Sequence, residues 1–160
     1  HCSAGPARRL SFSSLPMPME LNHLAVDEPP HPSASIVLLR DGAAGLEVFL
    51  LRRHGDSAAF GGAYVFAGGK VDTADKGAQA MDRLDQNPGD LADQLGEPAL
   101  STADASGLYV AAVRELFEET AVLLAKGPGG TPTRPLQDML KGGMGFHAAM
   151  NRLARGLSNC

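Results

Sequence analysis

The stretch Arg114-Glu115-Leu116-Phe117-Glu118-Glu119 constrains this chain more than any other, because its spacing is helical and its two sides differ in chemistry. At about 100° per residue, Glu115, Glu118 and Glu119 fall within one narrow arc of a helix. The residues on nearly the opposite side are Tyr109, Val113, Leu116, Phe117 and Thr120. The pattern therefore predicts a helix with one face that packs and one face that is negative.

Three carboxylates on one helix face admit two interpretations. A glutamate-rich stripe is usually a solvated helix face. Like charges three and four residues apart nevertheless repel by roughly a few tenths of a kcal/mol per pair, and a cation would relieve that repulsion. Carboxylate oxygens suit Mg²⁺ or Mn²⁺, which keep water ligands and bridge to substrate phosphates. Arg114, one turn before Glu118, is placed to hold that carboxylate.

A pair of glycines follows the apolar, β-prone run Tyr64-Val65-Phe66. Directly after a strand, Gly68 and Gly69 allow the backbone to approach a ligand or a metal closely, and their carbonyl groups are potential oxygen ligands. An ordinary turn would use the same residues. The pair leads through five further residues to an acid, Asp75.

Together, the segments from Gly69 to Asp75 and from Arg114 to Val122 resemble the signature of the Nudix hydrolases. That signature is a glycine, five residues, a glutamate, seven residues, and then Arg-Glu-aliphatic-x-Glu-Glu-x-Gly-aliphatic. The resemblance covers roughly residues 35–126. Within that span, the glycine-rich part from Phe60 to Asp75 looks like the Nudix group that includes peroxisomal acyl-CoA diphosphatases and their bacterial relatives.

This chain departs from the signature in three places. First, 38 residues (Lys76 to Val113) stand where the signature has seven. An insertion of about 31 residues costs little, since closure entropy grows only logarithmically with loop length. Second, Ala121 replaces the final glycine, which would cost on the order of 1 kcal/mol if that residue is left-handed. Third, Asp75 is one methylene shorter than the expected glutamate, and we expect it to buttress the site less well.

The resemblance implies an α/β (α+β) fold, an α/β/α sandwich with a mixed sheet that is incomplete at the C-terminus. It implies a hydrolase that uses Mg²⁺ or Mn²⁺ to cleave the diphosphate linkage of a nucleoside diphosphate derivative. The expected substrate is coenzyme A or an acyl-CoA. Two alternatives stay open: a pyrophosphatase acting on ADP-ribose or a nucleotide sugar, and a nucleotide-binding module without catalytic activity.

By the same resemblance, Glu115, Glu118 and Glu119 are the metal-site and catalytic acids. Arg114 would orient them, and Gly69 would add its carbonyl to the metal site. Gly62, four residues before Phe66, matches the spacing of the motif that marks the coenzyme A-cleaving members, although Ala58 stands where that motif has its second arginine. The residues expected to bind substrate are Arg52, Arg53, Gly62, Phe66 and Gly68.

The two arginines and the histidine that follows them have alternative interpretations. Arg52 and Arg53 would contact phosphates, or would serve equally well to keep a strand end soluble. His54 is interpreted as a solvated loop residue rather than a catalyst.

Proline and glycine divide the chain. Six prolines in residues 1–34 predict a disordered leader, better explained by read-through of upstream sequence than by a targeting signal. Residues 35–126 are expected to form the domain core, with an insertion at about 76–103. Residues 127–160 would comprise a glycine-rich break and a helical segment of a truncated C-terminal part.

Local patterns predict the individual elements. Two strand-like runs flank a glycine-containing turn and indicate an antiparallel hairpin. Ser101, followed by Asp104, is a capping start for the long helix that reaches Glu119. The expected strands are 35–40, 46–52 and 122–125, and the other expected helices are about 78–84, 89–95, 136–141 and 146–157.

Composition excludes several classes of protein. With 160 residues, 44% hydrophobic residues and a net charge of −4, one domain with its own core is feasible and no basic excess favours nucleic acid. No apolar run approaches the ~20 residues of a membrane span. Cys2 and Cys160 are interpreted as free thiols in a reducing compartment. The expected location is the cytoplasm of a bacterium, or the peroxisome or mitochondrion of a eukaryote, and the expected partners are a small nucleotide and, as an option, a second copy of the chain.

Overall fold

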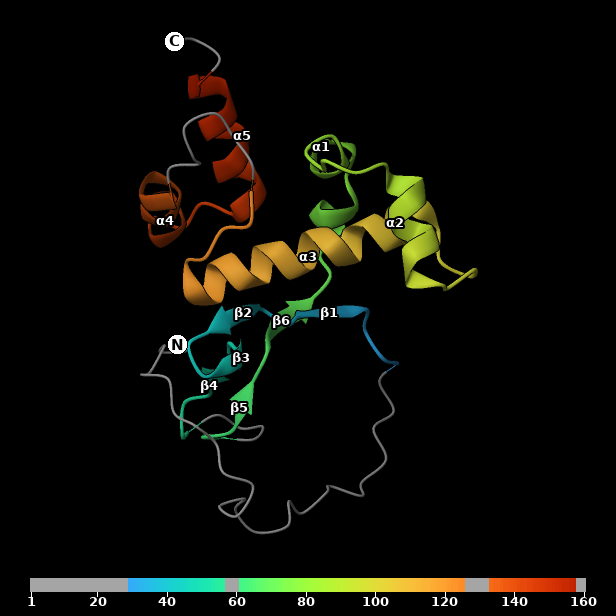
Figure 1. The fold of residues 1–160 in the computed structure, drawn as a ribbon. Coiled ribbons are helices and arrows are strands. Elements are labelled where there is room, and N and C mark those ends of the chain that lie inside the picture. The colour runs from blue at the N-terminus through green and yellow to red at the C-terminus, as the bar shows by residue number, and fades with distance from the viewer. Residues whose placement is uncertain (1–28, 57–60, 126–132, 158–160) are drawn as a thin grey trace.

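The computed structural model describes residues 29–56, 61–125 and 133–157 (Figure 1). Within these residues the fold is mixed, with three two-stranded antiparallel sheets and five α-helices. The longest helix, α3 (Thr102–Thr120), runs through the middle, with the strands on one side of it and the other helices on the opposite side (Figure 1). No helix among the described residues is long and apolar enough to cross a membrane.

The strands form three separate pairs. β1 (Ser33–Ile36) pairs with β6 (Ala67–Lys70), β2 (Leu39–Gly42) with β3 (Gly45–Val48), and β4 (Leu51–Arg52) with β5 (Tyr64–Val65). The β2–β3 pair is the predicted hairpin, closed by a tight turn in which Gly45 has a φ of 116°. A positive φ of this size suits glycine because it has no Cβ.

Two predicted strands are each divided in the structure. The run predicted over 35–40 contributes first to β1 and then to β2, which pair with different strands. The run predicted over 46–52 is likewise shared between β3 and β4. Ser33 and Ala34 already pair with β6, so the predicted leader boundary lies two residues too late. Residues 1–28 of that leader lie outside the described residues.

The long helix begins and ends where its sequence predicts. Ser101 is the N-cap, and its hydroxyl accepts a hydrogen bond of 3.1 Å from the Asp104 N–H. Such a cap satisfies an otherwise unpaired helix donor. At the other end Ala121 is left-handed, with a φ of 64°, and its N–H donates to the Phe117 carbonyl at 2.8 Å. A non-glycine residue in this conformation costs about 1 kcal/mol, as expected for Ala121.

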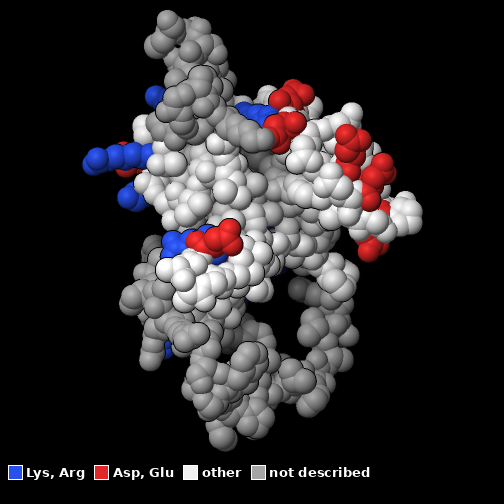
Figure 2. Space-filling model, viewed as in Figure 1, with Lys and Arg blue, Asp and Glu red and all other residues white. Residues whose placement is uncertain are grey.

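The insertion between the two signature-like segments contains helices. The 3₁₀-helix η2 (Thr73–Lys76) ends where the insertion begins, and α1 (Ala78–Met81) and α2 (Pro88–Leu95) follow within it. Asn87 caps α2 and Pro88 occupies its first turn. Both residues are favourable at a helix start, which explains why two separate helices form here, as the ranges 78–84 and 89–95 predicted. Acidic side chains gather over this side of the molecule in Figure 2, and α2 itself carries Asp90 and Asp93.

The last described helices are α4 (Thr133–Lys141) and α5 (Phe146–Leu157), close to the predicted ranges. They cover the apolar side of α3: Phe117 is buried together with Leu136, Phe146 and Ala149. On the strand side of α3, a second cluster buries Leu51, Ala67 and Leu116. The core therefore consists of two clusters, one on each side of α3.

The strand predicted over 122–125 is wrong, because these residues are in neither a strand nor a helix. Two local contacts give the physical reason. Ala121 turns the backbone into the left-handed region, and the N–H of Val122 then donates to the Thr120 hydroxyl at 3.0 Å instead of to a neighbouring strand. The glycine-rich break predicted from residue 127 lies outside the described residues.

Candidate functional site

Arg114 lies at the centre of the candidate site and is 5% exposed. Its Nε donates to Asp75 Oδ1 at 3.1 Å, and its Nη2 donates to Asp75 Oδ2 at 3.0 Å. Nη2 also donates to the Lys70 carbonyl at 2.9 Å. The remaining nitrogen, Nη1, donates to Glu115 Oε1 at 2.8 Å and to Glu118 Oε2 at 3.2 Å. One guanidinium thus connects β6, η2 and two acids of α3.

Asp75 is fully buried, and both of its carboxylate oxygens have two donors. Besides Arg114, the backbone N–H of Asp72 donates to Oδ2 at 2.8 Å, and His147 Nε2 lies 2.8 Å from Oδ1. Burial alone would raise the pKa of Asp75, but the hydrogen bonds from Arg114 and His147 outweigh it and hold that pKa below its ordinary value. Although Asp75 is one methylene shorter than a glutamate, it reaches Arg114 in a bidentate pair.

The neighbouring carboxylates also stabilise the charged form of Arg114. Burial works to lower the pKa of Arg114, whereas the carboxylates of Asp75 and Glu115 raise it, and the net shift is upward. Removing either partner of such a buried pair leaves an uncompensated charge.

The glycine pair of β6 lies directly against the carboxylates of α3. A Cβ placed on Gly69 would lie 2.4 Å from the carboxyl carbon of Glu115, and one on Gly68 would lie 2.3 Å from the Ala34 carbonyl oxygen. The N–H of Gly68 donates to Glu119 Oε2 at 3.3 Å. Close approach of the chain itself, by Ala34 at Gly68 and by Glu115 at Gly69, explains both glycines. The approach of a ligand or a metal to this backbone stays a prediction.

Glu118 and Glu119 have raised pKa values. Burial is the main cause for both carboxyls, and the negative charge of Glu115 adds to it. Arg114 opposes the rise in the pKa of Glu118, while the Gly68 N–H and the charge of Arg53 oppose the rise in the pKa of Glu119. The ionised acids therefore repel one another in a partly buried setting, which a cation would relieve.

The donor chemistry of this cluster suits a divalent cation, but its present geometry does not hold one. Hard carboxylate oxygens are the ligands that Mg²⁺ and Mn²⁺ prefer. In the part of the chain that the structure describes, no three His, Cys, Asp or Glu side chains converge in a way that would hold a metal ion. Arg114 Nη1 binds Glu115 Oε1 and Glu118 Oε2, and the Gly68 N–H binds Glu119 Oε2, so each contact engages one of the two oxygens of its carboxylate.

Only some of the residues predicted to bind substrate interact with the carboxylates of α3. Arg53 extends the β4–β5 pairing through its backbone, and its charge acts on Glu119. Gly62 has a φ of 76° and its N–H donates to the Arg53 carbonyl at 3.2 Å, so it shapes this loop. Arg52 pairs with Tyr64 in the same ladder, and Phe66 is 43% exposed just before β6. Of the five, only Gly68 and Arg53 are brought to the carboxylates by the interactions described here.

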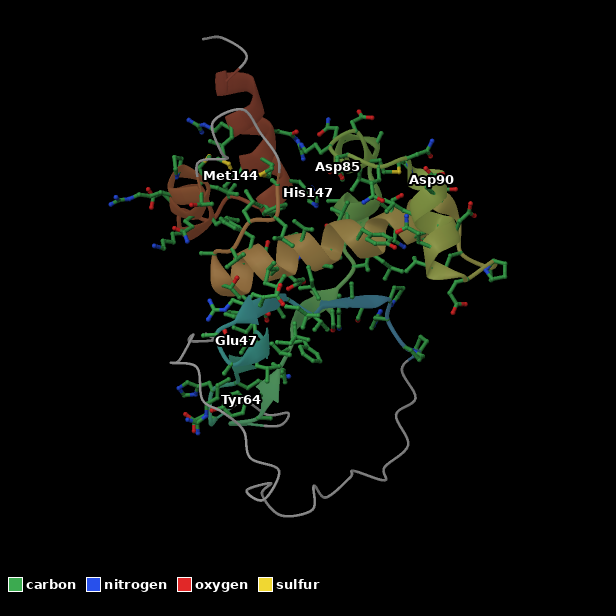
Figure 3. The ribbon with its side chains drawn as sticks, in the orientation of Figure 1. Glu47, Tyr64, Asp85, Asp90, Met144 and His147 are labelled. Carbon is green, nitrogen blue, oxygen red and sulfur yellow. The ribbon has the colours of Figure 1, made fainter. Side chains whose placement is uncertain are left out.

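His147 is the member of the site that sequence reasoning missed. It lies at the start of α5 (Figure 3), 72 positions along the chain from the aspartate that it contacts. The only signal in the sequence is a histidine beside the apolar stripe of a predicted helix, and nothing in that pattern indicates its partner. His54, which the sequence does single out, has an exposed side chain and contacts Asp56 two residues away, as a solvated loop residue would.

Comparison with protein-family models, curated proteins and solved structures gives no match. The chain's own residues therefore carry the functional argument.

Proposed function

We propose that this chain is a Nudix-type hydrolase with an α/β/α arrangement, which cleaves the diphosphate linkage of a nucleoside diphosphate derivative. One observation carries the proposal: the two signature-like segments, separated by 38 residues, meet through the bidentate pair of Arg114 with Asp75. The contact of Gly69 with Glu115 joins the same segments a second time. An arginine that fixes two acids beside a glycine pair is the arrangement that the resemblance implies.

The residues that would hold Mg²⁺ or Mn²⁺ are Glu115, Glu118, Glu119 and the Gly69 carbonyl. When bound there, the cation would neutralise the diphosphate and lower the pKa of the attacking water. A carboxylate of the cluster would accept the proton of that water. Arg114 would orient the acids, and Arg53, whose charge acts on Glu119, would contact a phosphate bound at the cluster.

Coenzyme A or an acyl-CoA is the proposed substrate, cleaved to a phosphopantetheine product and 3′,5′-ADP. The support is the sequence around Gly62 and the stretch from Phe66 to Asp75. ADP-ribose and nucleotide sugars are the competing substrates, so kcat/KM across a panel of these compounds decides among them. A clear preference for ADP-ribose or a sugar nucleotide would remove the coenzyme A assignment and leave the hydrolase assignment in place.

The test of the hydrolase itself uses Glu118→Gln and Glu119→Gln. Each change removes one ligand charge without a large change of volume, and we expect kcat to fall at least about 100-fold while folding is kept. Glu47→Gln is the matched control, because Glu47 lies on the β2–β3 hairpin and pairs with Arg40 rather than with the site (Figure 3). Unchanged turnover in both site variants, or turnover without added divalent cation, would refute the proposal.

A nucleotide-binding module without catalysis is the second candidate, and one observation favours it. Arg114 already donates hydrogen bonds to Glu115 and Glu118, so the chain itself supplies a cationic partner for two of the three acids. A module of this kind would bind coenzyme A or ADP-ribose in calorimetry, with an affinity independent of Mg²⁺, and would release no product on prolonged incubation. Release of 3′,5′-ADP that requires Mg²⁺ would exclude it.

A further inference from the structure

α5 meets the beginning of the insertion along a row of polar side chains. His147 and Asn151 stand four residues apart, and so do their partners Asp75, Gln79 and Arg83. A spacing of four places His147 and Asn151 on one face of α5, and their partners come from η2, from α1 and from the turn after α1. Asn151 Nδ2 donates to Gln79 Oε1 at 2.8 Å, and Arg83 Nη2 donates to Asn151 Oδ1. Figure 3 shows His147 where the first turn of α5 lies over α3.

The first contact of this row differs from the others because its acceptor belongs to the candidate site. Asp75 is fully buried, and its Oδ1 is shared by Arg114 Nε and His147 Nε2. An ionised carboxylate only accepts hydrogen bonds, so the proton of this contact resides on Nε2 of the histidine. His147 is therefore a donor that fixes the same oxygen as the arginine.

The histidine ring is itself held in place by aromatic neighbours. The rings of Phe146 and His147 meet edge to face, with centroids 5.6 Å apart and an angle of 86°. Phe146 also packs against Phe117 of α3, with centroids 6.0 Å apart. Through these contacts the position of α5 against α3 sets the direction from which Nε2 reaches Asp75.

We propose that His147 is a positioning residue: it locks the Asp75 carboxylate, which in turn holds the guanidinium of Arg114 against Glu115 and Glu118. Without this donor, Asp75 Oδ1 keeps Arg114 as its partner but loses the second hydrogen bond that stops the carboxylate from turning. The docking of α5 is thereby coupled to the geometry of Glu115 and Glu118, which lie 32 and 29 positions before His147 in the chain. The expected effect on catalysis rests on the proposed hydrolase function, whereas the effect on Arg114 does not.

The test compares three variants that keep the helix. His147→Leu removes the donor at similar volume, His147→Gln keeps a donor, and Asn151→Leu is the matched control, since it breaks the next contact of the row without touching Asp75. The readout is the Nε–H signal of Arg114 in nuclear magnetic resonance, as its exchange with solvent. We expect exchange to accelerate about tenfold or more in His147→Leu, to return to within about threefold of the wild type in His147→Gln, and to stay unchanged in Asn151→Leu.

Activity provides a second, separate readout. If the chain is a diphosphatase, kcat should fall about tenfold in His147→Leu with KM changed less than about twofold, because misaligned acids impair the reaction more than binding. If the wild type hydrolyses no diphosphate, the proposed function fails, yet the Arg114 exchange still decides the role of His147. Equal acceleration in His147→Leu and Asn151→Leu would show that the row only docks α5, and would overturn the inference. Should His147→Leu not fold, His147→Asn, whose shorter side chain withdraws the donor, replaces it with the same expected outcome.

Discussion

At the scale of single residues, the pair formed by Asp75 and Arg114 dominates the energetics of the site. Both side chains are buried, so neither can exchange its partner for water. Breaking a buried pair on one side is costly because the other charge stays behind. The acids Glu118 and Glu119 are in the opposite situation, since burial and the charge of Glu115 disfavour their ionised forms.

We predict that Asp75→Asn lowers the free energy of unfolding by about 3 kcal/mol at pH 7. The pKa of Asp75 lies below its ordinary value of 3.8, so the stability that its ionised form contributes is present above that value and is lost as the pH falls through the lower, folded-state pKa. The acid limb of the stability curve should therefore be shallower in the variant. Urea denaturation from about pH 3 to pH 7 measures both effects. An unchanged acid limb would contradict the buried pair.

For Glu119→Gln we predict unchanged or slightly higher stability at pH 7, within about 1 kcal/mol. A raised folded-state pKa means that the native state binds more protons than the unfolded state, so this group's contribution to stability decreases as the pH rises. The amide removes that penalty and can still accept the hydrogen bond of the Gly68 N–H. Thermal melts also test the cation: Mg²⁺ should raise the Tm of the wild type and not that of the variant. A large loss of stability in the variant would show that the carboxylate is structural.

At the scale of elements, β6 and α3 touch with no space between them. A side chain at position 69 would meet the carboxylate of Glu115 on α3, and one at position 68 would meet the carbonyl of Ala34 on β1. The close approach fixes how far α3 lies from the strands, and with it the place of all three acids.

Gly69→Ala should destabilise the protein by about 1–3 kcal/mol, because the new methyl group would lie 2.4 Å from the Glu115 carboxyl and must displace it or separate β6 from α3. Gly55→Ala is the control, since a Cβ there meets nothing within 4 Å. Chemical denaturation of the two variants gives the comparison. Equal stabilities would mean that α3 and β6 are not in contact at Gly69.

At the scale of the whole molecule, α3 is enclosed by strands on one side and by α4 and α5 on the other. The cluster of Phe117, Leu136, Phe146 and Ala149 covers the apolar side of α3 that a further sheet would otherwise have to cover. Several apolar side chains of the β2–β3 hairpin are exposed, among them Leu39, Leu46 and Val48. The strand register puts these three side chains on the same face of the hairpin. Exposed apolar faces of this kind favour association.

We predict that Leu136→Ala costs about 3 kcal/mol, since Leu136 is fully buried and its truncation leaves a cavity beside Phe117. Hydrogen exchange should become faster in α4 and α5 while the β1–β6 pair changes little, because the two clusters lie on opposite sides of α3. Leu39→Ala is the control: the side chain is 56% exposed, and its loss should cost less than about 0.5 kcal/mol. Uniform acceleration of exchange throughout the molecule would instead indicate one cooperative core.

The sequence by itself determined the features that depend on neighbours within one or two turns. It located both ends of α3, the turn of the β2–β3 hairpin, the range of α5 and the contact of Arg114 with Glu118. Caps, helical periodicity and i, i+4 contacts are set by local geometry, which the order of residues fixes. The pairing of Asp75 with Arg114 was accessible only through the family resemblance.

Only the tertiary structure decided which strands pair, that residues 122–125 leave the sheet, and that His147 reaches Asp75. A strand-like run carries the same pattern whichever partner it finds, so the sequence cannot choose between β6 and β3 for the two halves of one run. A histidine likewise carries no mark of an acceptor 72 positions away. These contacts exist because α4 and α5 pack on Phe117 and bring the first turn of α5 to the buried carboxylate, and packing of that kind is a property of the whole chain.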